Sequence, residues 1–118
     1  MAKEIEVSIS ISVEKGGVSM TRAQSFKPTM TGDAMIHAVQ EIPTGGEVLA
    51  ESDALGAPGW VYVKNLDSNN YVTLGSHQTD NHTVKLLPGE STAFRCVTAI
   101  FAKADTASLN VEYMVIEL

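Results

Sequence analysis

The side chains best able to do chemistry in this chain lie close together in one polar segment, residues 75–84. His77, Asp80 and His82 bring two imidazoles and a carboxylate into it, a set that could hold a divalent metal ion or form a catalytic site. The rest of the segment is rich in Ser, Thr, Asn and Gln, and no ligand-spacing rule singles the three residues out. We therefore expect an exposed turn here, with a metal or catalytic site as the alternative.

Two further residues of reactive type have structural interpretations. Cys96 is the only cysteine, so one chain can build neither an internal disulfide nor a cysteine-based zinc site. It follows Arg95 in a strand-like run with no sign of a base that would activate its thiol, which predicts a small buried apolar residue on a strand. His37 has the apolar neighbours Ile36 and Ala38 and is expected to be a half-buried structural histidine.

Polar and aromatic side chains between residues 60 and 71 suggest two kinds of binding site. The oxygens of the Asp67–Asn70 turn could coordinate calcium, yet this turn lacks the spaced acidic ligands and the closing glutamate of a calcium loop. A tight polar hairpin turn is expected instead, because Asn and Asp satisfy the backbone groups of turns. Trp60, Tyr62 and Tyr71 could stack on a sugar ring, although a single Trp at the start of a strand is more typical of a core or a subunit interface.

Absent motifs, the net charge and the lack of long apolar segments exclude several classes of function. The GxSxG, HExxH, P-loop and dinucleotide-binding patterns are absent, so we expect no enzyme, no cofactor and no catalytic or metal-binding residue. The net charge of −6, with scattered Lys and Arg, disfavours nucleic acid as a direct partner. The sequence has neither a secretory signal nor an apolar stretch long enough to span a membrane, which predicts a soluble protein made in the cytoplasm.

The first residues alternate between apolar and polar side chains. Odd positions of the run Glu4–Glu14 are all apolar, namely Ile5, Val7, Ile9, Ile11 and Val13. This period of two predicts a long strand with one buried face, and residues 1–15 are expected to form an extended strand or arm. Gly16 and Gly17 supply a turn, and a returning strand that stops before Pro28 should complete a hairpin.

The rest of the chain predicts further strands. The run Met35–Ile42 fits a short helix about as well as a strand, and we prefer a strand. Turn residues bound the β-branched and aromatic runs Gly59–Leu66, Tyr71–Gly75, His82–Leu87, Ser91–Lys103 and Ser108–Leu118. About seven or eight short strands predict a single domain over residues 1–118, an all-β antiparallel sandwich of jelly-roll type with little or no helix.

Two of these runs are apolar at successive positions. They are Trp60–Val63 and Tyr113–Ile116, in which neighbouring side chains point to opposite faces of a sheet. One face should fill the core, and the other face should meet a neighbour.

Four different short motifs follow one another in the second half of the chain. They are GWVYVKNLDSNNYV at residues 59–72, LLPGE at 86–90, AKADTA at 102–107 and the pair Glu112-Tyr113. In order and spacing these motifs resemble those of a family of small tailed-bacteriophage virion structural proteins. The corner at 86–90 departs from the family pattern at Leu87, where Lys is common.

The resemblance implies a capsid decoration, or cement, protein of a bacteriophage. Such a protein is expected to be a homotrimer on the outer surface of the head, where it bridges major capsid subunits. Its partners would be copies of itself and the major capsid protein, without nucleic acid, membrane or cofactor, and it would be synthesised in the host cytoplasm. One alternative is a neck, tail or fibre-associated virion component. Another is a carbohydrate-binding host-attachment module, which requires exposed coplanar aromatic rings.

Termini and loop tips are the expected contacts with these partners, because they can reach a neighbour without disturbing the core. The arm Met1–Glu6 and the turn Asp67–Asn70 are the main candidates, although the arm could equally be an edge strand with solvated carboxylates. With the aromatic positions, the candidate interface residues are Lys3, Glu4, Glu6, Trp60, Tyr62, Asp67, Asn69, Asn70 and Tyr71.

Overall fold

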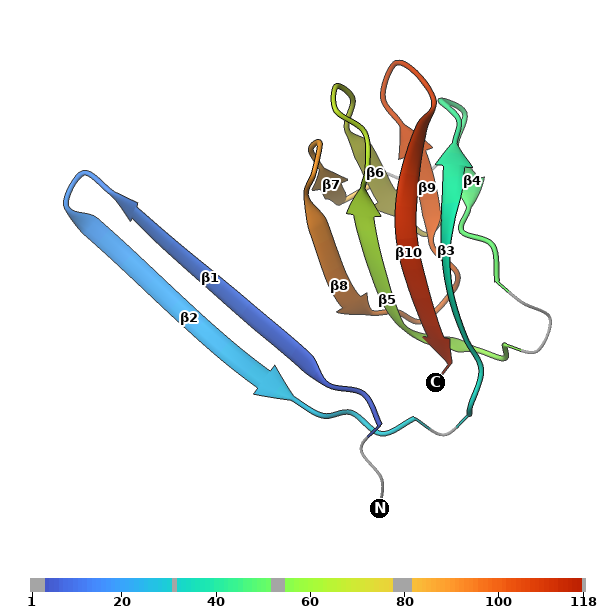
Figure 1. Cartoon of the computed structure of the whole chain (residues 1–118), viewed down its shortest axis with the longest axis horizontal. Coiled ribbons are helices and arrows are strands. Elements are labelled where there is room, and N and C mark those ends of the chain that lie inside the picture. The colour runs from blue at the N-terminus through green and yellow to red at the C-terminus, as the bar shows by residue number, and fades with distance from the viewer. Residues whose placement is uncertain (1–3, 31, 52–54, 78–81, 118) are drawn as a thin grey trace. The chain divides into compact units, whose positions relative to one another are not determined.

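The computed structural model describes residues 4–30, 32–51, 55–77 and 82–117, and all of its regular secondary structure there is β-strand. Contacts between residues group the chain into two compact units, a hairpin unit, Met1–Thr31, and a body, Gly32–Leu118 (Figure 1). The single domain expected over residues 1–118 stays a prediction. The strand expected within residues 1–15 is present as β1 (Val7–Lys15), and it is the first strand of a hairpin.

The hairpin unit consists of the two antiparallel strands β1 (Val7–Lys15) and β2 (Val18–Phe26). Gly16 and Gly17 join them with φ angles of +60° and +82°. Two successive positive φ angles define the two-residue turn that best matches the twist of a hairpin, and glycine adopts them without strain. At the base, the Ile5 N–H donates to the Pro28 carbonyl (3.3 Å). The predicted hairpin is therefore confirmed.

The apolar face of this hairpin is exposed, so the prediction of a strand with one buried face is wrong for most of β1. Ile5 and Val7 are buried, but the apolar residues beyond them are between 37% and 67% exposed. A two-stranded unit has no second layer of its own that could cover either face. We call this surface the apolar hairpin face, and its members are Ile9, Ile11, Val13, Val18, Met20 and Phe26.

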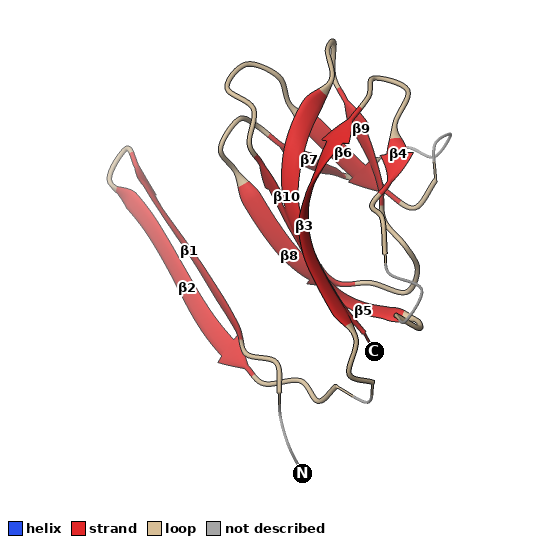
Figure 2. Cartoon of the chain, turned by 45° about the vertical axis from the view of Figure 1, so that its right-hand side comes forward, coloured by secondary structure: helices blue, strands red, loops and turns tan. Residues whose placement is uncertain are grey.

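The body is a sandwich of two four-stranded antiparallel sheets (Figure 1, Figure 2). The first sheet has the order β3 (Met35–Ile42), β10 (Leu109–Glu117), β5 (Pro58–Asn65) and β8 (Ser91–Arg95). The second sheet has the order β4 (Glu47–Val48), β9 (Phe101–Ala104), β6 (Val72–Gly75) and β7 (Val84–Leu86).

Strand pairing in the body is nested. The pairs β3·β10, β4·β9, β5·β8 and β6·β7 bring the first strand against the last and proceed inward. A long hairpin that folds over into two sheets in this way is an eight-stranded jelly roll. The predicted all-β antiparallel sandwich of jelly-roll type is therefore confirmed.

The core lies between the two sheets. Alternate residues of β5 and β10 point into it, including Val61, Val63, Val111 and Tyr113, which are at most 2% exposed. Valine and other β-branched residues suit this position because they pack well on a pleated surface. The Tyr113 hydroxyl donates to the Ala50 carbonyl (2.7 Å), and burial raises the pKa of this phenol.

The prediction of strand for Met35–Ile42 is confirmed by β3, and most of the later strands lie within two residues of their predicted ends. The single strand predicted over Ser91–Lys103 is wrong, because the chain leaves the first sheet after β8 and enters the second sheet at β9. The Cys96 N–H donates to the Gly59 carbonyl (2.8 Å) where this crossing begins. The two-residue strand β4 was not predicted, since it is too short to show a period.

The turn Asp67–Asn70 also differs from its prediction. It was expected to close a hairpin between two paired strands, but β5 and β6 belong to different sheets. The turn therefore carries the chain from the first sheet to the second, and it does not connect two paired strands of one sheet.

Candidate functional site

The outer face of the first sheet carries two cross-strand rows of large side chains. The register places Ile116 between Met35 and Trp60, and Met114 between His37 and Tyr62. Met35 is 63% exposed, and Val39, two residues further along β3, is 60% exposed. We call this surface the outer sheet face, and its apolar members are Met35, Val39, Trp60, Tyr62, Met114 and Ile116. The large apolar side chains expected on this face of the sheet are present. The neighbour expected to contact the face stays a prediction.

Trp60 and Tyr62 belong to the candidate interface, and both lie on the outer sheet face. Trp60 is only 9% exposed, and the Arg95 guanidinium carbon lies 5.5 Å from its ring centroid. Such a cation over an aromatic face is attractive. Trp60 is therefore largely covered, whereas Tyr62 is half-buried.

Tyr71 lies apart from these two rings, because it directly precedes β6 of the second sheet. The Lys85 ammonium lies 4.2 Å from the centroid of its ring. The negative charge of Asp105 raises the pKa of the Tyr71 phenol. The three aromatic residues thus do not share one sheet face.

His37 is not half-buried as predicted, because it points outward from β3 while Ile36 and Ala38 pack against the core. Its side chain is 59% exposed, and its Nε2 atom lies 2.7 Å from a carboxylate oxygen of Glu112 on the neighbouring strand. An apolar neighbour on each side in sequence indicates an outward position in a strand, since side chains alternate.

A buried asparagine organises the end of the body that contains the sequence motifs. Asn65, at the end of β5, is fully buried. Its side-chain amide donates to the carbonyls of Asn70 (2.9 Å) and Leu86 (3.0 Å). Its side-chain oxygen accepts from the Asp67 N–H at 2.9 Å. Because a buried amide must satisfy all its polar atoms, this residue fixes the positions of two loops at once.

Asp67 completes the turn next to Asn65. One of its carboxylate oxygens accepts from the N–H groups of Asn69 (2.9 Å) and Asn70 (2.7 Å). These donors, that of Asn70 first, lower the pKa of the Asp67 carboxyl. The Asp67 carboxylate and the N–H groups of Asn69 and Asn70 are therefore bonded to one another within the turn.

The three longest sequence motifs meet at this end, which is the upper end in Figure 1. The Thr106 hydroxyl donates to the Asn70 side-chain oxygen at 2.9 Å, which joins the motif at 102–107 to that at 59–72. The Gly89 N–H donates to the Asn65 carbonyl (3.1 Å), which joins the motif at 86–90 as well. The motif residues thus hold loops together, and among them Asp67, Asn69 and Asn70 have a structural role in addition to any interface role.

At the N-terminus, the candidate residues fall at the base of the hairpin. A carboxylate oxygen of Glu4 accepts from the Met30 N–H (3.0 Å), and Glu6 is exposed. Lys3 lies outside the described residues, as do Met1 and Ala2.

Glu117 makes a structural contact that sequence reasoning missed. Its carboxylate accepts from the N–H groups of Asp33 (3.1 Å), Ala34 (2.9 Å) and Gly56 (3.0 Å). These donors, that of Ala34 first, lower the pKa of Glu117. A side chain at Gly32 would collide with the carboxylate. The sequence gives no signal for these hydrogen bonds, because Glu117 ends a strand and its donors are more than 60 residues away in sequence.

The histidines of the polar segment are partly explained by packing. The His82 ring lies against Gly75, where a Cβ atom would collide with it. Its Nδ1 atom lies 2.9 Å from the Thr73 hydroxyl, and its Nε2 atom lies 2.9 Å from the His77 carbonyl. Among the described residues, no group of three or more His, Cys, Asp and Glu could hold a metal ion. Asp80 lies outside those residues, so the metal alternative stays untested.

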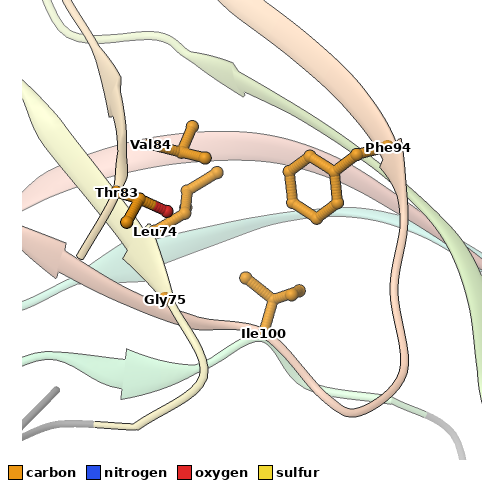
Figure 3. Close-up of a pocket in the computed structure, with 6 residues that line it drawn as sticks. All are labelled: Leu74, Gly75, Thr83, Val84, Phe94 and Ile100. Carbon is orange, nitrogen blue, oxygen red and sulfur yellow. The ribbon is translucent and has the colours of Figure 1, made fainter. Parts of the chain in front are cut away.

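A small cavity of about 220 Å³ is lined by residues of both sheets of the body (Figure 3). Phe94 and Ile100 face Leu74 and Val84 across it, and Thr83 brings a hydroxyl. None of the lining residues is ionisable. A pocket of this kind lacks the convergent polar groups that a catalytic site needs.

Cys96 lies just after β8 and is half-buried, so it is neither on a strand nor fully buried as predicted. The chain leaves the sheet at this residue, which explains the difference. Burial, the largest cause, raises the pKa of its thiol. A raised pKa keeps the thiol protonated and weakly nucleophilic at neutral pH.

Comparison of the chain with protein-family models, with curated proteins and with solved structures found no match. The resemblance carried by the motifs is thus a basis for a proposal only. In the part of the chain that the structure describes, no helix is long and apolar enough to cross a membrane.

Proposed function

We propose that this chain is a structural component of a bacteriophage virion, a capsid decoration protein that binds the outer surface of the head. It bridges neighbouring major capsid subunits and strengthens the contacts between them. The role needs neither a catalytic residue nor a cofactor. The motifs at 59–72, 86–90 and 102–107 support this proposal through their resemblance to small virion proteins.

The observation that carries the proposal is the exposed apolar hairpin face. A two-stranded hairpin is at best marginally stable alone in water, and the largest apolar patch of a soluble monomer is about 300–600 Å². Six large apolar residues that are 37–67% exposed on one hairpin are therefore explained by assembly with another surface. A jelly roll that presents such an element suits a particle subunit better than a monomeric enzyme.

Stabilisation of the particle would come from repeated interfaces. Each interface of standard size buries about 1,600 Å² in total and can contribute several kcal/mol after the costs of association. Many copies on a lattice multiply this contribution along the weak seams between capsid subunits. The acidic net charge of −6 suits an external surface, away from packaged nucleic acid.

A neck, tail or fibre-associated position uses the same surfaces and is the first alternative. A carbohydrate-binding module receives less support, because Trp60 is 9% exposed and Tyr71 precedes a strand of the second sheet whereas Tyr62 lies in the first. A sugar platform requires exposed rings on one face.

The test is the number and position of copies in purified particles, from quantitative mass spectrometry and a particle reconstruction. We expect hundreds of copies spread over the head lattice, as a decoration protein requires. A few to a few dozen copies at one vertex would move the protein to the neck or tail, and its absence from particles would overturn the proposal.

A second measurement tests the stabilising role. Particles that lack the protein should bind purified protein and then release DNA at a higher temperature. Unchanged DNA release in spite of saturated binding would contradict a cementing role while leaving the virion location intact.

A further inference from the structure

We propose that the apolar hairpin face of one copy docks on the outer sheet face of a second copy of this chain, so that copies are joined by exchanged hairpins. This inference deepens the proposed function, since it names how copies assemble, and it rests on the assembly part of that function.

The hairpin has the pattern of a sheet layer that is missing its partner. Ile9, Ile11 and Val13 of β1 share one side with Val18, Met20 and Phe26 of β2, and Val13 and Met20 are direct cross-strand partners. Lys15, Arg22 and Gln24 lie on the same side, opposite Val18, Ile11 and Ile9. Residues on the other side are mostly small and polar, namely Ser8, Ser10, Ser12, Glu14, Ser19, Thr21, Ala23 and Ser25. The concentration of large apolar residues on one side is typical of a sheet with one face on a core and one face in water. The apolar side also has a shallow depression of about 350 Å³ between Ile11, Val13 and Met20.

The outer sheet face offers a matching surface on the body. Met35 and Val39 of β3 are about as exposed as the hairpin residues, and Met114 and Ile116 of β10 continue the apolar surface toward Tyr62. The strands β1, β2 and β10 have nine residues each, which corresponds to about 30 Å. A hairpin can therefore lie along the full length of the sheet, and two apolar surfaces are covered by one contact.

Charge favours this pairing over a contact between two hairpins. The hairpin unit has four basic and three acidic residues, a formal charge of +1, whereas the body has four basic and eleven acidic residues, a charge of −7. Lys15 and Arg22 are the only charged residues among the paired positions of the apolar side of the hairpin, and both are positive. The outer sheet face has two acidic positions, Glu41 and Glu112, and two basic positions, Lys64 and Arg95, so the charge difference lies between the two units as wholes. Two hairpins packed on their apolar sides would instead bring like charges together.

The contact joins two different surfaces of the chain, so it can be exchanged reciprocally by two copies about a two-fold axis or can run head to tail as a heterologous contact. Such contacts close into rings when the rotation between copies permits it. A closed ring would leave no copy with an uncovered apolar hairpin face. The predicted homotrimer is one such ring.

Crosslinking between isotopically distinct copies tests the contact directly. A Met20→Cys, Cys96→Ser variant is labelled with a photoreactive maleimide and mixed with an excess of ¹⁵N-labelled Cys96→Ser protein by joint refolding. We expect crosslinks from the labelled hairpin to ¹⁵N peptides that contain residues 35–42, 58–65 or 109–117. Crosslinks only to ¹⁵N residues 7–26 would show contact between hairpins, and crosslinks only within ¹⁴N chains would show docking within one copy. Either result overturns the proposal, and so does a wild-type chain that sediments as a monomer at all concentrations.

Complementation provides the second test. Ile11→Asp with Met20→Asp disables the hairpin, and Met35→Asp with Val39→Asp disables the acceptor, so each variant alone should sediment as a monomer. Their mixture should form a one-to-one heterodimer, because it still contains one intact hairpin and one intact acceptor. Ser10→Asp with Thr21→Asp adds the same charges to the other side of the hairpin and should leave the oligomer unchanged. A mixture that stays monomeric, or equal effects of both hairpin variants, would contradict the exchange.

These results are separable from those for the proposed function. Exchange in solution together with absence from particles would remove the virion role and keep the contact. Presence on the head lattice without crosslinks between copies would support the virion role and exclude the exchange of hairpins.

Discussion

Asn65 shows how a motif without chemistry can determine structure at the scale of single residues. Its side chain ties the turn at 67–70 to the corner at 86–90, and both loops would lose their anchor without it. The polar residues of the motifs are therefore explained mainly by the hydrogen bonds of one end of the body.

The first prediction concerns this residue. Asn65→Ala leaves the buried Leu86 carbonyl, the partly buried Asn70 carbonyl and the Asp67 N–H without this partner, so the free energy of unfolding should fall by roughly 1–3 kcal/mol. Urea denaturation followed by circular dichroism measures the change. Asn69→Ala, at an exposed position of the same turn, is the matched control and should change the free energy by less than about 0.5 kcal/mol. Equal losses for both variants would refute the anchoring role.

The second prediction concerns pH. Backbone donors lower the pKa values of Asp67 and Glu117 in the folded chain. The stability that these two groups provide is therefore present above the ordinary carboxyl pKa and is lost as the pH falls through the folded values. Burial raises the pKa of Glu51, which has the opposite sign, so the test compares variants and not the wild type alone.

Asp67→Asn with Glu117→Gln should be less stable than the wild type near neutral pH and should lose less stability between about pH 7 and pH 3. Urea midpoints at a series of pH values give both curves. Glu6→Gln, at an exposed position of the hairpin unit, should follow the wild type. Parallel curves for the double variant and the wild type would show that these carboxylates do not contribute to acid sensitivity.

The hairpin is the unusual component at the scale of elements. Its residues contact one another and form a unit distinct from the body. The jelly roll has its own core, and all the described residues of that core belong to the body. Folding of the body should therefore be independent of the outer part of the hairpin.

The third prediction removes this part. Replacement of Ile9–Gln24 by Asn-Gly joins the register partners Ser8 and Ser25 by a favourable two-residue turn and keeps the base. At a concentration where the wild type is monomeric, the thermal midpoint should change by less than about 4 °C, which corresponds to under 1 kcal/mol in a domain of this size. Calorimetry measures it, and a body that no longer unfolds cooperatively would contradict independence.

At the scale of the whole molecule, two apolar surfaces lie on one acidic chain. The fourth prediction follows from their proposed contact, because association that requires the native state stabilises that state by mass action. The thermal midpoint of the wild type should rise with protein concentration, whereas that of Ile11→Asp with Met20→Asp should not. Scanning fluorimetry over a concentration series is sufficient, with Ser10→Asp with Thr21→Asp as the control. A midpoint independent of concentration in all three proteins would argue against self-association.

The sequence alone determined the features that depend on local pattern. Period-two alternation identified β1, the two glycines identified its turn, and β-branched runs between turn residues identified the later strands and the all-β sandwich. Such signals are visible because the side-chain period of a strand and the φ angles of a turn are local properties. The same pattern could not show which surface covers the apolar side of β1, since burial depends on another layer.

Only the tertiary structure decided the features that join distant residues. Glu117 accepts from backbone groups at residues 33, 34 and 56, and Asn65 accepts and donates across two loops, but neither contact has a spacing rule. The crossing of the chain between sheets after β8 and the separation of Tyr71 from Trp60 also depend on sheet assignment. Which sheet a strand joins is decided by its pairing with strands far away in sequence. The local pattern cannot predict this pairing, because it is compatible with several.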